Sequence, residues 1–417
     1  MDNTQTLLVI GAGHAGVELA FAARQQGWAG DIVLLGEEPH LPYHRPPLSK
    51  GLLCGTADVA SLALRQAPAF EAAGITLRLG TQVRAIDREA HRVRLQDGSV
   101  LGYARLALCT GGRARTLTVP GTQDSLPPNL FSLRSQSDAV AIAASLRAGS
   151  RLVVIGAGYV GLEVAASARK LGAAVTVLES QPRVLARVTG AEVSSFYEAV
   201  HREAGVDLRT SVTVRAIERN DDGAATAVLC GDGARLPADI VVVGIGMGPD
   251  TALAEACGLR VEGGIVVDPH SVTSDPDIVA AGDCTLQDSA LYGRRVRLES
   301  VPNALEQARA AAGWLCGKPR PHHAVPWFWS DQYDLKLQMT GLSEGYDTCV
   351  VRGSFASRSF CAFYLREGRL IAADAVNRPG DFMLAKKAVA ARAIVNAAAL
   401  ADIESPLRDL LASSVPA

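Results

Sequence analysis

The sequence of 417 residues predicts an α/β protein with two Rossmann-like units and a smaller α+β domain at its C-terminal end. Three observations predict this fold. A strand–glycine–helix signature opens the chain, and a second copy begins near residue 152. The alternation of strand and helix patterns then gives way to strand-like segments after about residue 320. Strands that alternate with helices are typical of parallel sheets covered by helices.

The first signature begins with the apolar run of residues 7–10, which leads into the glycine loop GAGHAG of residues 11–16. A helical pattern follows to about residue 27, and a second apolar run at residues 32–35 ends before Glu37. This order of strand, glycine loop, helix, strand and acid is the fingerprint of a βαβ unit that binds a dinucleotide.

The second signature repeats each part of the first. The run of residues 152–155 leads into the loop GAGYVG of residues 156–161, and a helical pattern reaches about residue 172. A second run at residues 175–178 ends before Glu179. In both copies the glycines let the backbone approach a pyrophosphate, the helix N-terminus faces that anion, and the acid accepts a hydrogen bond from the adenosine ribose. One glycine motif can be only a tight turn, but two copies in this context predict two dinucleotides and a redox relay.

The simplest topology inserts the second nucleotide-binding unit, residues 113–243, into the first, which comprises residues 1–112 and 244–320. A proline-rich stretch then marks a linker to the C-terminal α+β domain of residues 324–417. An alanine-rich run predicts a closing helix over about residues 383–400.

Composition narrows the classes of function. The net charge of −2 disfavours a nucleic-acid-binding protein. The cysteines are scattered without a C-x-x-C pair, so we expect free thiols, and we expect no metal site. No uncharged apolar stretch is long enough for a membrane helix, and the first residues are polar and lack a secretory signal. We therefore expect a cytoplasmic protein.

Three further segments carry a resemblance to a known family. Residues 42–50, PYHRPPLSK, are similar to the flavin loop of the FAD-dependent NADH:ferredoxin reductases of oxygenase systems. Residues 299–304 and 326–332 resemble the later flavin segments of that family. The resemblance covers the whole chain and implies a fold of the glutathione reductase type. That fold consists of an FAD-binding domain, an inserted NAD-binding domain and a C-terminal interface domain, and the implied cofactors are FAD and NADH.

The resemblance also implies which residues contact the two cofactors. The implied FAD contacts are Gly11, Gly13, Ala15, Gly16, Glu37, Arg45, Pro46, Lys50, Val83, Arg134, Asp283, Val301 and Trp329. The implied NADH contacts are Gly156, Gly158, Tyr159, Val160, Gly161, Glu179, Arg187, Ile245 and Gly246. Read without the resemblance, Val83 is only a strand residue, Asp283 is a helix cap or turn residue, and Trp329 is a core residue.

Lys50 and Glu163 are the catalytic residues that the resemblance implies. Lys50 would be a fixed cation that favours the reduced, anionic flavin, and Glu163 would be its partner. A buried lysine without a partner tends to lose its proton, so such a lysine needs a carboxylate. Alternatively, Lys50 is a solvated loop lysine, and Glu163 is an acid stabilised by the N-terminus of its own helix.

Four residues of the second unit bear on the nicotinamide cofactor. Tyr159 resembles the family's aromatic gate over the nicotinamide pocket, or alternatively packs on the first helical turn. Glu179 predicts a preference for NADH, because a carboxylate accepts a hydrogen bond from the free 2′-hydroxyl and repels a 2′-phosphate. We expect Arg187 near the cofactor and Arg183 in solvent.

The electron acceptor is predicted from an absence in the sequence. Disulfide-reducing relatives of this fold carry a cysteine pair near residues 40–50, where this chain has no cysteine, and Cys54 lacks a resolving partner. We therefore expect electrons to leave one at a time, to a small [2Fe–2S] ferredoxin that serves a cytochrome P450 or a Rieske-type oxygenase. A rubredoxin is the close variant. A non-catalytic NADH sensor similar to apoptosis-inducing factor would have a basic surface and a targeting segment, and the sequence shows neither.

The ferredoxin is expected to dock on positive charge. Oxygenase ferredoxins are typically acidic, so cations should gather around the exposed flavin edge. The candidate docking residues are Arg309, Lys336, Lys386 and Lys387. Each of them alone is an ordinary solvated charge, and only their convergence would make a docking surface. We expect a monomer or a weak dimer.

Overall fold

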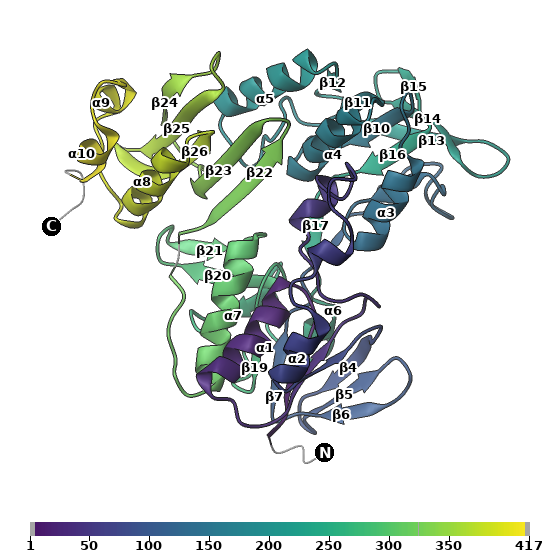
Figure 1. Cartoon of the computed structure of the whole chain (residues 1–417), viewed down its shortest axis with the longest axis vertical. Coiled ribbons are helices and arrows are strands. Elements are labelled where there is room, and N and C mark those ends of the chain that lie inside the picture. The colour runs from purple at the N-terminus through teal and green to yellow at the C-terminus, as the bar shows by residue number, and fades with distance from the viewer. Residues whose placement is uncertain (1–4, 324, 413–417) are drawn as a thin grey trace. The chain divides into compact units, whose positions relative to one another are not determined.

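The structure is a computed structural model that describes residues 5–323 and 325–412 (Figure 1). The chain folds into two compact units. Unit 1 comprises Met1–His44, Ala60–Arg113 and Gly248–Pro326, and unit 2 comprises Arg45–Val59, Ala114–Met247 and Trp327–Ala417. The chain passes from one unit to the other within the short strands β8 (Gly112–Ala114) and β17 (Met247–Pro249). The three domain boundaries inferred from the sequence stay a prediction.

Unit 1 is built on a parallel five-stranded sheet in the order β19-β7-β1-β2-β3. Its strands are β1 (Leu7–Ile10), β2 (Ile32–Leu35), β3 (Ile75–Arg78), β7 (Arg105–Leu108) and β19 (Ile278–Ala280). All residues of β1 and β2 are buried, as expected of central strands covered on both faces. Two three-stranded sheets complete the unit: β4 (Val83–Asp87), β5 (Arg92–Leu95) and β6 (Val100–Gly102), and β18 (Ile265–Val267), β20 (Thr285–Ser289) and β21 (Arg294–Val296).

Helices α1 and α7 of unit 1 pack side by side (Figure 1). Ala20 and Ala23 of α1 and Ala308 and Ala311 of α7 are buried in one core cluster, and such small side chains let two helices approach closely. The helices of this unit are α1 (His14–Gln26), α2 (Ala67–Ala72), α6 (Ala252–Ala256) and α7 (Val301–Leu315), with a 3₁₀ turn at Ala60–Leu62.

Unit 2 begins with the 3₁₀ helix η2 (Pro46–Ser49) and contains a second parallel sheet in the order β12-β11-β10-β16-β9. Its strands are β9 (Leu130–Ser132), β10 (Arg151–Ile155), β11 (Ala174–Leu178), β12 (Asp207–Arg209) and β16 (Ile240–Val243). The helices are α3 (Gln136–Ser145), α4 (Tyr159–Lys170) and α5 (Ala191–Glu203), and a small sheet has β13 (Val214–Arg219), β14 (Ala225–Cys230) and β15 (Arg235–Pro237).

The rest of unit 2 is an antiparallel sheet in the order β22-β23-β26-β25-β24. Its elements are β22 (Trp327–Gln332), β23 (Leu335–Gly341), β24 (Thr348–Ser354), β25 (Ser359–Arg366), β26 (Arg369–Val376), α8 (Pro379–Ala390), α9 (Ala397–Ala401) and α10 (Leu407–Ala412). Leu162 of α4 and Tyr197 of α5 share one buried cluster with Leu337, Phe360 and Tyr364 of this sheet. The predicted fold class is confirmed, and the two five-stranded sheets of unit 2 contribute residues to one buried cluster.

The predicted helix over about residues 383–400 is wrong in its middle. Helix α8 ends at Ala390 and α9 begins only at Ala397. The backbone N–H of Val395 donates to Gly368 O at 2.8 Å, and the N–H of Leu370 donates to Ala393 O at 2.9 Å. Hydrogen bonds to Gly368 in the turn before β26 and to Leu370 of β26 therefore replace the helical ones.

A buried arginine ties the end of the chain to this sheet. Arg352 of β24 is 4% exposed. Its guanidinium donates to the carbonyl oxygens of Leu400 at 3.2 Å, Ile403 at 3.0 Å and Ser405 at 2.7 Å, and also to that of Asp402. Four backbone acceptors thus compensate one buried charge.

The core of unit 2 also contains a carboxylate. Asp374 of β26 is 3% exposed, and it accepts hydrogen bonds from Tyr364 Oη at 2.7 Å and from Thr189 Oγ1. Burial raises the pKa of Asp374 from 3.8 to about 6, against the opposing effect of these two donors. Between these values the folded protein binds a proton that the unfolded chain does not bind, so this group lowers stability as the pH rises.

Replacing Asp374 with asparagine should therefore remove a pH-dependent loss of stability. The difference in unfolding free energy between the Asp374→Asn variant and the unmodified protein should shift in favour of the variant by about 2–3 kcal/mol between about pH 4 and pH 7. Denaturant titrations at both pH values measure this shift, with the exposed Asp334→Asn as the control. Equal differences at both pH values would contradict the assignment.

Within residues 5–323 and 325–412, no helix is long and apolar enough to cross a bilayer. No group of three or more histidine, cysteine, aspartate or glutamate side chains in that part of the chain is arranged to hold a metal ion.

Candidate functional site

The first glycine loop of unit 1 has the backbone of a phosphate-binding turn. Gly11 has φ +105°, and a Cβ there would lie 2.1 Å from the carbonyl oxygen of Cys109. A Cβ on Gly16 would lie 1.9 Å from the carbonyl oxygen of Gly11. No heavy atom lies within 4 Å of the corresponding position on Gly13, which precedes α1 and gives that helix no side-chain cap. Two glycines are therefore required by packing, and the middle one leaves room for an anion at a helix N-terminus.

The second loop, in unit 2, repeats this geometry. Gly156 has φ +104°, and its Cβ would lie 2.4 Å from the carbonyl oxygen of Gly244. The Cβ of Gly161 would lie 2.1 Å from the carbonyl oxygen of Gly156, whereas Gly158 again faces open space before α4. The residues present fit the pyrophosphate of one dinucleotide in each unit.

The acid that closes each βαβ unit follows its strand, as predicted. Glu37 accepts a hydrogen bond from Gln82 Nε2 at 3.0 Å and pairs with Arg113 Nη2 at 3.1 Å. Arg113 also pairs with Asp250 at 2.8 Å. Sequence reasoning missed Arg113, because no spacing rule joins it to an acid 76 residues earlier.

Glu179 of unit 2 braces its own glycine loop. Its Oε2 accepts a hydrogen bond from the backbone N–H of Ala157 at 2.8 Å, and its Oε1 accepts one from the N–H of Gln181 at 2.8 Å. The carboxylate is thereby fixed at the end of β11, where a ribose hydroxyl of a dinucleotide would reach it.

Other predicted FAD residues of unit 1 lie around its glycine loop. The backbone of Gly282 lies against Ala15 of α1, since a Cβ on Gly282 would be 3.2 Å from that of Ala15. Asp283 therefore follows next to the start of α1, in a turn and not at a helix N-terminus. Val83 is the first residue of β4 and is buried, and Val301 is the first residue of α7.

The structure brings Lys50 and Glu163 of unit 2 together. Lys50 Nζ lies 2.8 Å from Glu163 Oε1, and their side chains are 20% and 4% exposed. Glu163 also accepts hydrogen bonds from Ser49 Oγ at 2.5 Å and Ser330 Oγ at 2.6 Å. The alternative of a solvated lysine is therefore wrong, and Glu163 is held by three donors from outside its own helix. Sequence reasoning missed Ser49 and Ser330, although both lie in segments that carried the family resemblance.

The remaining FAD residues of unit 2 lie on or beside η2, after β9 and on β22. Arg45 precedes η2, in which Pro46 is the first residue, and Arg45 Nη1 donates to the carbonyl oxygen of Arg134 at 2.7 Å. Trp329 of β22 is only partly buried, and its ring centroid lies 5.7 Å from that of Trp327. An exposed portion of Trp329 thus remains for contact with a cofactor.

Tyr159, the first residue of α4, packs on the antiparallel sheet. Its hydroxyl lies 2.7 Å from Met339 Sδ, and its ring centroid lies 4.8 Å from that of Phe328. The alternative in which Tyr159 packs only on its own helical turn is wrong. Burial raises the pKa of the Tyr159 hydroxyl well above its usual value, so it stays protonated. Met339 and Phe328 were not predicted, because only the fold brings them to residue 159.

The neighbouring NADH candidates differ in exposure. Val160 is 43% exposed, and Arg187 is also exposed. The Arg187 guanidinium lies beside Gly246, with Nη2 3.4 Å from the position of a Cβ there, and Ile245 is half-buried. The expectation that Arg183 is solvated is wrong. It is half-buried because its guanidinium donates to the carbonyl oxygens of Thr189 at 2.9 Å and Ala186 at 3.0 Å.

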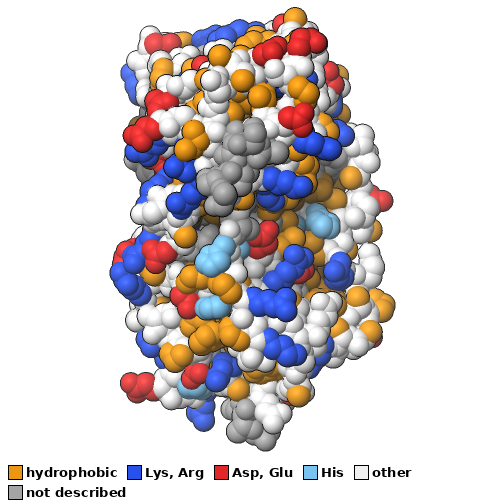
Figure 2. Space-filling model, turned by 90° about the vertical axis from the view of Figure 1, so that its left-hand side faces the viewer, with side chains coloured by type: hydrophobic (Ala, Val, Ile, Leu, Met, Phe, Trp, Pro, Cys, Tyr) orange, Lys and Arg blue, Asp and Glu red, His pale blue; other side chains and the backbone are white. Residues whose placement is uncertain are grey.

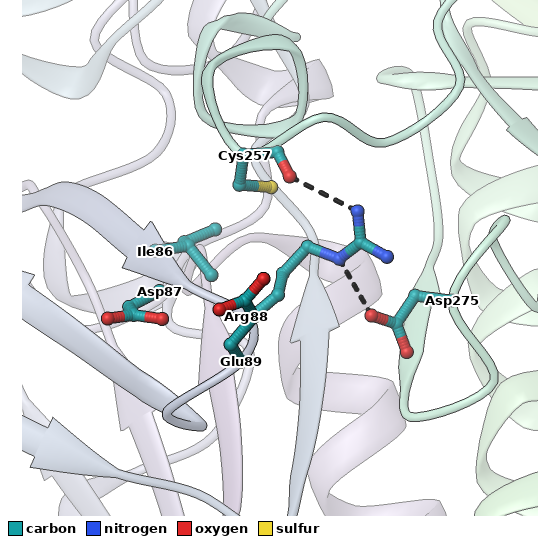
Figure 3. A pocket seen from close by; sticks show the side chains of 6 residues that line it. All are labelled: Ile86, Asp87, Arg88, Glu89, Cys257 and Asp275. Atoms are coloured by element: carbon teal, nitrogen blue, oxygen red, sulfur yellow. Dashed lines mark hydrogen bonds and ion pairs between the residues drawn. The ribbon is translucent and has the colours of Figure 1, made fainter.

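Unit 1 also contains a pocket with its own lining residues (Figure 3). It is lined by Ile86, Asp87, Arg88, Glu89, Cys257 and Asp275 and has a volume of about 640 Å³. Arg88 Nε donates to Asp275 at 2.7 Å and its Nη1 donates to Cys257 O at 3.2 Å. None of the predicted site residues lines this pocket, and its arginine is already paired.

Comparison with known proteins agrees with the two glycine loops. Residues 5–308 match the model of the pyridine nucleotide-disulphide oxidoreductase family, and residues 327–411 match the reductase C-terminal domain. Putidaredoxin reductase of Pseudomonas putida is 50% identical over 415 residues, which cover 99% of this chain and 98% of that protein. The ferredoxin–NAD(+) reductase component of an anthranilate 1,2-dioxygenase system from Burkholderia cepacia is 42% identical, covering 97% and 98% of the two chains.

A solved structure agrees with the whole fold. The covalent complex of putidaredoxin reductase and putidaredoxin matches with a TM-score of 0.95 at 50% identity and covers 99% of each chain. The predicted cofactors, FAD and a nicotinamide dinucleotide, are those of the matched family. The resemblance inferred from the flavin loop is therefore confirmed. The chain belongs to the pyridine nucleotide-disulphide oxidoreductases and, among them, to the ferredoxin reductases related to putidaredoxin reductase.

Proposed function

We propose that this protein is an FAD-dependent NADH:ferredoxin reductase. It passes electrons from NADH, one at a time, to a small [2Fe–2S] ferredoxin that serves a cytochrome P450 or a Rieske-type oxygenase. The observation that carries the proposal is the flavin loop, which presents the paired lysine Lys50 and has no cysteine of its own. All eight cysteines are free, which is typical of cytoplasmic proteins, and we propose that the protein is cytoplasmic. We also propose that it is a monomer or a weak dimer.

The proposal assigns a task to each group of residues. The loop of Gly11, Gly13 and Gly16 binds the pyrophosphate of FAD, and the loop of residues 156–161 binds that of NADH. A bound FAD would supply the capacity to take up a hydride and to give up electrons singly. The chain itself supplies orientation and a fixed positive charge at Lys50. Glu163 keeps that cation paired and in place, which favours charge developing on the cofactor.

A direct experiment tests this function. NADH should bleach the purified yellow protein, and fast reduction of cytochrome c should then require an added [2Fe–2S] ferredoxin. If NADH bleaches the protein but cytochrome c reduction is supported by an added rubredoxin and by no ferredoxin, the assignment of a ferredoxin as the electron acceptor is wrong. If NADH causes no bleaching, the reductase proposal fails altogether.

The four proposed docking residues differ in whether another side chain of this protein contacts their charged group. Arg309 pairs with Glu18 at 2.6 Å, so its charge is locally neutralised. Lys386 Nζ lies 5.0 Å from the ring centroid of Trp327. Lys336 and Lys387 are exposed. In Figure 2, Lys and Arg side chains are interspersed with acidic and hydrophobic ones.

Reversing the charge of Lys387 should slow ferredoxin reduction. We expect a three- to tenfold lower second-order rate for Lys387→Glu at low salt, roughly the size of a steering effect, and a smaller difference at high salt. Stopped-flow mixing of the reduced protein with ferredoxin measures this rate. The flavin reduction by NADH should not change. Arg215→Glu, an exposed position on β13, is the matched control. A rate independent of salt, or equal slowing of both half-reactions, would show that the docking surface is misplaced.

A further inference from the structure

A chain of buried polar side chains leads away from Glu163 inside unit 2. Ser330 Oγ lies 2.6 Å from Glu163 Oε1, and Gln332 Nε2 lies 3.1 Å from Ser330 Oγ. His201 Nε2 lies 2.8 Å from Gln332 Oε1, and Tyr333 Oη lies 3.1 Å from His201 Nδ1. Ser330, Gln332 and His201 are no more than 1% exposed. This series of hydrogen bonds connects α5 to β22 and ends at Glu163, the partner of Lys50.

The direction of every hydrogen bond in this chain is determined. A carboxylate only accepts, so Ser330 gives its single proton to Glu163 and must accept from the amide N–H of Gln332. The amide oxygen of Gln332 then faces His201, which must donate from Nε2. Burial lowers the pKa of His201 to about 4, so the ring is neutral and its Nδ1 accepts from Tyr333. All four donors therefore point toward Glu163.

The side-chain amide of Gln332, in the middle of this series of hydrogen bonds, determines whether protons or only polarisation can pass along it. The side chain of Gln332 neither gains nor loses a proton near neutral pH, so it blocks proton transfer between Ser330 and His201. Aligned hydrogen bonds in a medium of low dielectric constant polarise one another. These hydrogen bonds therefore convey polarisation to Glu163 but relay no proton to it from His201.

We propose that His201 and Gln332 are positioning residues that act through Ser330 on Glu163. They hold its carboxylate oriented, and Glu163 in turn holds Lys50. The inference rests on the proposed function, because it gives Lys50 its role beside the flavin. A purely structural chain would tie α5 to β22 and contribute only to stability.

The test uses the complete protein with FAD bound. Gln332→Met keeps the length of the side chain and removes both polar groups. We expect the rate of flavin reduction by NADH to fall about three- to tenfold, as for loss of one hydrogen bond between neutral groups, with FAD retained. The flavin midpoint potential should move in the same direction as in Lys50→Met. Tyr333→Phe, at the far end of the chain, should have the smallest effect.

A conservative variant separates positioning from packing. His201→Gln keeps an N–H that can donate to Gln332, and should restore most of the rate that His201→Phe loses. If Gln332→Met and His201→Phe lower the melting temperature but leave rate and potential unchanged while Lys50→Met changes both, the inference is overturned and the proposed function stands. If Lys50→Met also changes neither, the role of the ion pair in the proposed function fails with it. If Gln332→Met does not fold, the His201→Gln and His201→Phe pair decides.

Discussion

Replacing Lys50 with methionine should slow flavin reduction by NADH about a hundredfold while FAD stays bound, which is the usual cost of removing one preorganised charge. The side chain is mostly buried and lies 2.8 Å from Glu163, so its charge is fixed and partly shielded from water. Methionine has a similar length and no charge, and it leaves Glu163 with only its two serine donors. The flavin midpoint potential should also fall, because the reduced cofactor loses a nearby cation.

Anaerobic stopped-flow mixing with NADH measures the rate, and equilibrium titration with a reference dye measures the potential. Lys318→Met, at an exposed lysine of unit 1, is the control for loss of a positive charge. An unchanged rate and potential in Lys50→Met would refute the assigned role. Loss of FAD from the variant would instead make Lys50 a structural residue.

The protein should use NADH at least about a hundredfold more efficiently than NADPH, because a 2′-phosphate would be placed against the carboxylate of Glu179. Glu179→Gln should narrow that ratio about tenfold. The glutamine can still accept a hydrogen bond from the N–H of Ala157, so the glycine loop keeps its brace while the negative charge is lost.

Values of kcat/KM for both nucleotides, measured with one ferredoxin or with an artificial acceptor, give this ratio. Glu218→Gln on β13 removes a charge at an exposed ion pair and should leave the ratio as it was. Equal use of NADH and NADPH by the unmodified protein would exclude Glu179 as the selective residue.

The parts of the fold that could be predicted from the sequence are those determined by residues close together in the chain. The glycine loops could be predicted because their constraint is local. The backbones of Gly11 and Gly16, five positions apart, approach too closely for a side chain, and the same holds for Gly156 and Gly161. The strands that flank them are short, mostly apolar runs. The gap between α8 and α9 was missed, since alanines favour a helix and the competing acceptor, Gly368, lies elsewhere in the chain.

The parts of the site that involve distant residues needed either the family resemblance or the structure. Lys50 and Glu163 were paired only by resemblance, because nothing in their spacing indicates contact. The chain through Ser330, Gln332 and His201 was not foreseen, since a histidine on a helix and a glutamine on a strand have no signature. Arg183 was misjudged for the same reason, as its acceptors are backbone carbonyls of a loop whose curvature the sequence does not reveal.

The four backbone carbonyls that accept hydrogen bonds from Arg352, here called the carbonyl cage, make the effect of a C-terminal truncation depend strongly on where the chain is cut. All four acceptors lie between Leu400 and Ser405, so a proteolytic cut before Leu400 would remove them together. It would leave the buried guanidinium of Arg352 without these backbone acceptors. A cut after Ser405 would leave the cage complete. A boundary between a stable and an unstable C-terminal sheet therefore lies within this short segment.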